Sequence, residues 1–149
     1  MSVGLLQIQS AIAALAIPGL KRIYTSANVP FTLYDRLCPA LIPHPVTPII
    51  QSDSSVLTLG GAAARGWQRP RTLMYTCLTA EMGTVSRAGT HGQRLSQVWD
   101  ALENALCDFA MEGLHNAGPV QLAAAHPVND HSGKEFFGFE VRFTFLTSY

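Results

Sequence analysis

The stretch "RLSQVWDALENALCDFA", residues 94–110, decides the fold because it carries the strongest periodic signal in the chain. Its apolar residues recur at the 3-4-3 spacing of one helical face that is buried against a core. The pattern predicts a long amphipathic helix from about Gln93 to Gly113. The apolar face holds Leu95, Val98, Trp99, Leu102, Ala105, Leu106, Phe109 and Ala110, and the acidic residues Asp100, Glu103, Asp108 and Glu112 fall on the other faces.

A segment near the end of the chain supplies a partner for this helix. Between Phe137 and Phe145, apolar residues alternate with Gly138, Glu140, Arg142 and Thr144, which is the period of a strand with one wet face. In a chain this short, the apolar face of the strand and the apolar stripe of the helix are each other's best cover. We therefore expect the helix to pack on a sheet that includes residues 137–145.

Weaker patterns predict the remaining elements. Apolar residues at helical spacing indicate a first helix from about Val3 to Ala16, with Ser2 as its N-cap and Pro18 and Gly19 as its stop. Further strands are expected at residues 38–43, 55–59, 72–79 and 120–124, and loops at residues 60–71, 80–93 and 126–134. This order predicts an α+β fold, a mainly antiparallel sheet packed against two helices, in a single domain spanning residues 1–149.

Composition limits the classes of protein that the chain fits. Charged residues make up 13% of it, against about 25% in ordinary soluble domains, while 48% are hydrophobic, which favours oligomerisation. The formal charge of zero argues against a dedicated nucleic-acid binder. No apolar run approaches the roughly 18 residues of a membrane span, so no membrane partner is expected. Cys38, Cys77 and Cys107 are too few and too scattered for a disulfide framework and are expected to be buried thiols.

The stretch "LCPALIPHPVTPII", Leu37 to Ile50, is apolar and rich in proline. Proline fixes φ and removes a backbone donor, so neither a helix nor an unbroken central strand is expected here. An extended segment this apolar needs a cover, and we expect a neighbouring subunit to supply it.

Charge is unevenly distributed along the chain. The bases Arg65, Arg69, Arg71, Arg87 and Arg94 face a single acid, Glu81, between residues 60 and 94, and the following stretch carries only acids. One interpretation is an interface that joins a positive and a negative region. The other is a set of solvated charges without a partner.

Motifs that carry chemistry are weak. Neither Gly60-Gly61 nor Gly89/Gly92 leads into the Lys of a phosphate loop, and the histidines lack zinc-ligand spacing. Ser86 lacks the strand-turn-helix context of a nucleophile elbow. The loop from His126 to His131, with Asp130, is the one conceivable metal cluster, and a polar turn explains it as well. We expect no catalytic residue, metal or cofactor; a small enzyme or ligand-binding domain that uses this loop or Ser86 is the alternative.

The layout resembles that of the tail terminator proteins of long-tailed bacteriophages, small α+β subunits that form a hexameric ring capping the tail tube. The resemblance spans nearly the whole chain. Its local elements are the pattern at Leu37, Pro39, Ala40, Leu41 and Ile42 and the terminal "FEVRFTF", residues 139–145. The prolines at 43, 45 and 48 and the long Arg-bearing loop depart from the compact version of the pattern.

The resemblance implies a structural virion protein without catalytic activity, located in the phage neck or tail and in the host cytoplasm during assembly. It would stop tail-tube polymerisation and join the tail to the head. Its implied partners are further copies in a ring, the tail tube protein and a head-completion or connector protein, with non-specific contact to DNA in the channel.

Within such a ring, each subunit presents two different surfaces to its neighbours. We expect the proline-rich segment to form one of these contacts. We expect the basic loop at residues 60–71 of one copy to pair with the acidic helix of the next copy in another. The same loop is expected to project toward a neighbouring ring or line the DNA channel. The expected interface residues are Pro39, Leu41, Ile42, Pro43, Pro45, Arg65, Arg69, Arg71, Asp100, Glu103, Asp108 and Glu112.

Overall fold

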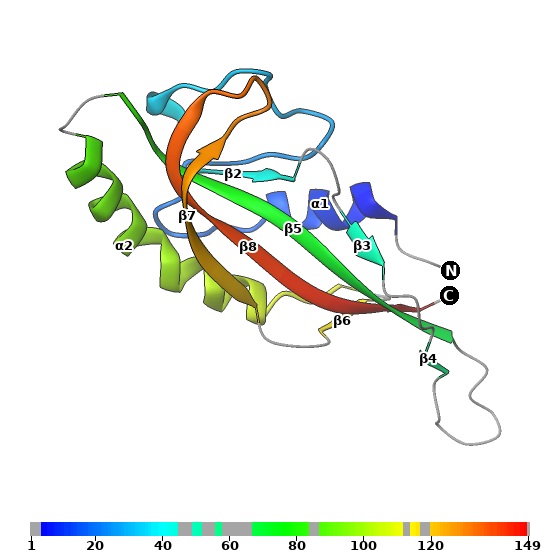
Figure 1. The fold of residues 1–149 in the computed structure, drawn as a ribbon. Coiled ribbons are helices and arrows are strands. Elements are labelled where there is room, and N and C mark those ends of the chain that lie inside the picture. The colour runs from blue at the N-terminus through cyan, green and yellow to red at the C-terminus, as the bar shows by residue number, and fades with distance from the viewer. Residues whose placement is uncertain are drawn as a thin grey trace.

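The computed structural model describes residues 4–44, 49–51, 56–57, 67–83, 87–111, 114–116 and 120–148. Within these ranges it has two α-helices, one 3-10 helix and one sheet, which confirms the α+β class (Figure 1). The helices are α1 (Leu5–Ala13), η1 (Asp35–Leu37) and α2 (Arg87–Cys107). The strands are β1 (Arg22–Ile23), β2 (Ala40–Pro43), β3 (Ile49–Gln51), β4 (Val56–Leu57), β5 (Trp67–Glu81), β6 (Leu114–Asn116), β7 (Gln121–Asn129) and β8 (Glu135–Ser148).

Two long antiparallel strands, β5 and β8, form the centre of the sheet (Figure 1). Their pairing runs from Gln68 opposite Ser148 to Glu81 opposite Phe136, with one register shift between Leu78 and Ala80. Short strands pair in succession along the outer edge of β5, first β2, then β3 and β4. β7 and β6 do the same along β8, and β1 pairs with β2 in parallel. All described pairings except β1 with β2 are antiparallel, as expected.

The main core lies between the two helices and one face of the β5–β8 pair. Ile8 and Ile12 of α1 and Val98, Leu102 and Leu106 of α2 are fully buried in the same cluster. The sheet contributes Leu73, Tyr75, Cys77, Phe139, Val141 and Phe145 to it. Trp99 is half-buried, and its ring centroid lies 4.8 Å from that of Phe139. The predicted packing of the long helix on the closing strand is therefore confirmed.

A second, smaller core covers part of the opposite face of the sheet. The segment between β1 and β2 lies on the side away from α2 (Figure 1). Its Leu33 and Cys38 pack with Ile42, Val128 and Phe136, and all except Val128 are fully buried. The expectation that β8 has one wet face is thus wrong at its N-terminal end. Gly138 is buried there, where an added Cβ would collide with the carbonyl group of Cys77 and with Val128.

Several element boundaries differ from those expected. The N-cap of α1 is Gly4 rather than Ser2, and the N–H of Gly4 donates to Gln7 Oε1 at 2.8 Å. Helix α2 runs from Arg87 to Cys107, earlier at both ends than predicted, so Gly89 and Gly92 lie inside a helix. Residues 67–71 belong to β5 and residues 126–129 to β7, although both stretches were expected to be loops. In α2, β5 and β7, long-range packing or pairing overrides the local signal of Gly, Pro and polar residues.

We predict that Leu102→Ala destabilises the protein by about 2–5 kcal/mol, because it leaves a cavity at a fully buried position between α2 and the sheet. The matched control is Asp100→Ala on the exposed side of the same helix, which should change the free energy of unfolding by no more than about 0.5 kcal/mol. Thermal and urea unfolding measure both values. Equal stability of the two variants would show that α2 does not close the core.

Candidate subunit interface

Residues 38–43 of the proline-rich segment are buried within their own chain. Pro39, Leu41, Ile42 and Pro43 are all buried, and β2 lies between β1 and β5 in the sheet. Their side chains are therefore not available to a neighbour, which corrects their expected place in a subunit interface. The physical reason is that the prolines at 39 and 43 stand at the margins of β2, so a short strand still fits between them. Pro45 lies outside the described residues.

The arginines expected in a projecting loop have different surroundings. Arg69 and Arg71 lie in β5, opposite Thr147 and Phe145 of β8, because the cross-strand ladder extends to Gln68. Their assignment to a loop is therefore wrong. Arg65 lies outside the described residues.

Three exposed acidic residues lie on α2 or directly after it. Asp100, Glu103 and Asp108 are exposed, the last of them one residue beyond the helix, and Glu112 lies outside the described residues. Ion pairs within the described ranges join Arg94 to Asp35 and Lys134 to Glu81, and none involves these three acids. We call Asp100, Glu103 and Asp108 the acidic face.

Three basic residues gather at the β1 margin of the sheet, and sequence reasoning missed them. Lys21, Arg22 and Arg36 are exposed, and Lys21 Nζ donates to the carbonyl oxygen of Arg36 at 3.3 Å. The guanidinium of Arg36 also lies 5.2 Å from the ring centroid of Tyr34. Among the described residues none of the three bases forms an ion pair. We call Lys21, Arg22 and Arg36 the basic edge.

A partly buried polar cluster fixes the position of η1 and therefore of Arg36. Arg94 of α2 donates from Nη1 and Nη2 to the two carboxylate oxygens of Asp35, each at 3.1 Å, and from Nη1 to the carbonyl of Thr79 at 2.9 Å. Asp35 also accepts from the N–H of Glu81 at 2.9 Å. A bidentate pair of this kind has a single geometry. Arg94 is one of the bases that cluster between residues 60 and 94 of the sequence, and it forms its ion pair within its own chain.

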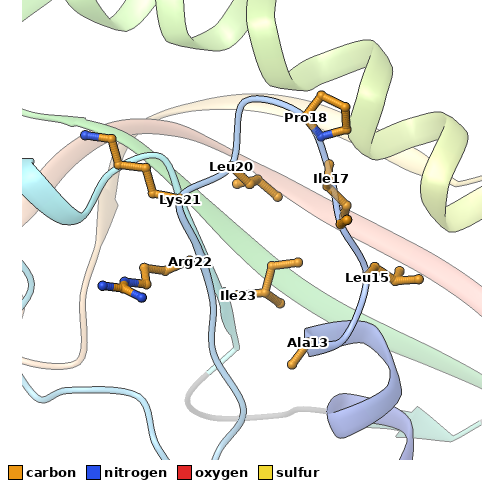
Figure 2. A pocket seen from close by; sticks show the side chains of 9 residues that line it. Ala13, Leu15, Ile17, Pro18, Leu20, Lys21, Arg22 and Ile23 are labelled. Atoms are coloured by element: carbon orange, nitrogen blue, oxygen red, sulfur yellow. The ribbon is translucent and has the colours of Figure 1, made fainter.

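A groove of about 400 Å³ lies beside the basic edge (Figure 2). Seven of its nine lining residues are aliphatic, and they come from the end of α1, the following segment and β1: Ala13, Leu15, Ala16, Ile17, Pro18, Leu20, Lys21, Arg22 and Ile23. Lys21 and Arg22 extend away from the aliphatic side chains in this view. Gly19 adopts φ +89°, and a Cβ there would collide with Val98 and the carbonyl of Gln97, so this segment sits tightly on α2.

The residues considered for chemistry do not form a shared site in the described part of the chain. Ser86 lies outside it, and His126 belongs to β7 rather than to a loop. Asp130 organises the β7–β8 turn: it accepts from the N–H groups of Ser132, Lys134 and Leu33, each at 2.9 Å, and from the Ser132 hydroxyl at 2.6 Å. The described residues contain no group of three His, Cys, Asp or Glu placed to hold a metal ion.

Comparison of the chain with protein-family models and with curated proteins finds no match in either. Among the described residues, no helix combines the length and the apolar character needed to cross a membrane.

We predict that the stability contributed by Asp130 depends on pH. Burial alone raises the pKa of this carboxyl, but the hydrogen bonds from Ser132, Leu33 and Lys134 outweigh it and hold the pKa below its ordinary value. The contribution is therefore complete above the unfolded-state pKa of about 4 and is lost as the pH falls through the lower, folded-state pKa.

The test is urea unfolding of the Asp130→Asn variant. At neutral pH it should be less stable than the parent by about 1.5–3 kcal/mol, and the difference should shrink as the pH approaches about 2. Asp108→Asn, at an exposed carboxyl, is the control. A difference that stays constant with pH would contradict the role of the carboxylate.

The cysteines should differ in reactivity. Cys107 is exposed, which corrects the expectation that all three thiols are buried. Burial raises the pKa of Cys38 to about 12, and it raises the pKa of Cys77 as well. At about pH 8 the folded protein should therefore take up one iodoacetamide, at Cys107, and the unfolded protein three. Peptide mass spectrometry identifies the sites, and labelling of Cys38 at the rate of Cys107 would contradict the buried core.

Proposed function

We propose that this protein is a structural subunit that forms a ring at the head-proximal end of a phage tail, where it terminates tail-tube polymerisation and joins the tail to the head. The element order supports this: an N-terminal helix, short strands, a long strand, a long helix and three closing strands follow the layout expected of a tail terminator. The proposed function is mechanical, so it requires surfaces that bind other proteins rather than a catalytic site.

The observation that carries the proposal is that the central strand pair is longer than the helix α2 that packs on it. β5 has 15 residues and spans about 50 Å at roughly 3.3 Å per residue. α2 has 21 residues and spans about 32 Å at roughly 1.5 Å per residue. In Figure 1 both β5 and β8 continue past the C-terminal end of α2.

A strand pair that extends beyond the helices is a surface suited to assembly. Neither α1 nor α2 lies over this end of the sheet in Figure 1. In a closed ring, adjoining subunits or layers can cover such an extension, and closure leaves no open end to the array. The low charge content of the chain supports the same conclusion, because 13% charged residues give little solvating surface.

The separation of charge also favours a head-to-tail contact. The acidic face stands on α2, and the basic edge stands on η1 and the β1 margin, so one subunit carries two different surfaces of opposite sign. Two unlike, complementary surfaces generate a ring when the rotation between copies closes. This replaces the expected role of the buried residues 39–43 in subunit contact.

We predict a hexamer. Native mass spectrometry of the purified protein, alone and with tail tubes, should give a species of about 97 kDa, six times the 16.1 kDa chain. Negative-stain images should show rings, and tail tubes assembled in their presence should stop growing at the capped end. A protein that stays monomeric at every concentration and leaves tube growth unchanged would overturn the proposal.

A further inference from the structure

We propose that the basic edge of one subunit, with the groove beside it, is the docking site for the acidic face of α2 of the next subunit. This inference rests on the proposed ring and names the residues that join its copies. The occupant is a second copy of this chain, and the contact is heterologous: the basic edge of each subunit meets the acidic face of its neighbour.

The first argument is charge. The basic edge carries three exposed cations, Lys21, Arg22 and Arg36, and the acidic face three exposed anions. Within the described residues none of the six forms an ion pair in its own subunit. The chain as a whole has a formal net charge of zero, with 10 basic and 10 acidic residues. Docking one surface on the other neutralises both, whereas a nucleic acid on the basic edge would leave the acidic face unpaired and repelled.

The second argument is that both surfaces are rigid. Asp35 is held by Arg94 and Glu81, so Arg36 beside it has a set position. The backbone of Lys21 is held in place because its N–H donates to the carbonyl of Pro39 at 2.9 Å. Asp100 and Glu103 stand on a helix whose opposite side is buried. Charges that are placed before contact lose little conformational freedom on binding.

The groove gives the contact an apolar component. Leu15, Ile17, Leu20 and Ile23 line it next to the basic edge. The N–H of Tyr24 donates to the carbonyl oxygen of Leu41 in β2 at 2.9 Å. Because successive residues of a strand direct their N–H and C=O groups to opposite sides, those of Ile23 point away from β2. Covering this margin removes apolar surface and a strand edge from water in one step.

A residue-specific cross-link tests the contact directly. The exposed Cys107 lies four residues after Glu103, one turn along the same side of α2. The chain has two lysines, Lys21 on the basic edge and Lys134, whose Nζ lies 3.2 Å from Glu81 Oε1. A short maleimide–succinimide cross-linker on the intact assembly should join Cys107 to Lys21 between copies. Mixing unlabelled and ¹⁵N-labelled protein identifies links between copies by mass spectrometry.

Charge reversal supplies the second test. Lys21→Glu with Arg22→Glu should weaken self-association at least about tenfold, and so should Asp100→Lys with Glu103→Lys. An equimolar mixture of the two double variants should assemble again, because each reversed surface then meets the reversed surface of the other variant. Arg142→Glu and Glu135→Lys, at exposed positions elsewhere on the sheet, are matched controls and should assemble like the parent.

The outcomes separate this inference from the proposed function. If assembly survives both reversals, or is lost in both and not restored by mixing, the docking site is overturned. Because the parent still assembles in either case, the proposed ring would stand. A parent protein that never assembles, alone or on tail tubes, would overturn the ring and this contact with it. Cross-links from Cys107 mainly to Lys134 would also overturn the site. Binding of a DNA oligonucleotide to the basic edge of the assembled parent would show that the edge is open and contradict the inference.

Discussion

The pairing of β5 with β8 is the interaction on which the rest of the structure depends. It joins segments far apart in the sequence along almost their whole length, from Gln68 opposite Ser148 to Glu81 opposite Phe136. Every other described strand except β1 pairs directly with one of these two. Because side chains alternate along each strand, one face of the pair receives both helices and the opposite face receives the segment before β2. Breaking this pairing would remove the platform for both cores.

The ion pair between Arg94 and Asp35 links the core to the surface that we propose for assembly. It connects the first half of α2 to η1, and the carbonyl of Thr79 and the N–H of Glu81 complete its hydrogen bonds. Arg36 therefore stands next to Lys21 as a consequence of an interaction on the inner side of η1. A structural pair with defined geometry in this way positions neighbouring charges that remain exposed. The same chemistry, guanidinium with carboxylate, would operate inside the subunit and between subunits.

The proline-rich segment illustrates how an apolar stretch can be misread. Its composition suggests a surface in need of a partner, and the subunit itself supplies that partner by inserting Ala40–Pro43 between β1 and β5. In the proposed ring, the contacts between copies are those of exposed charge beside the groove at the β1 margin. Such a contact is sensitive to salt: the Debye length falls from about 10 Å at 0.1 M to about 3 Å at 1 M. Ring stability that varies with ionic strength would follow from this arrangement.

The sequence by itself determined the elements whose signal is local and periodic. The stripe from Leu95 to Phe109 and the alternation from Phe137 to Phe145 identified the α2–β8 packing and the α+β class, because a helix and a strand each impose their own repeat on the residues that they bury. The exposure of Asp100 and Glu103 followed from the same repeat. Only the tertiary structure decided that residues 67–71 extend β5, that residues 39–43 are buried, and that Lys21 and Arg36 form one basic edge. These features arise from strand pairing and ion pairing between distant segments, and no short window of sequence carries the energy of contacts made across the fold.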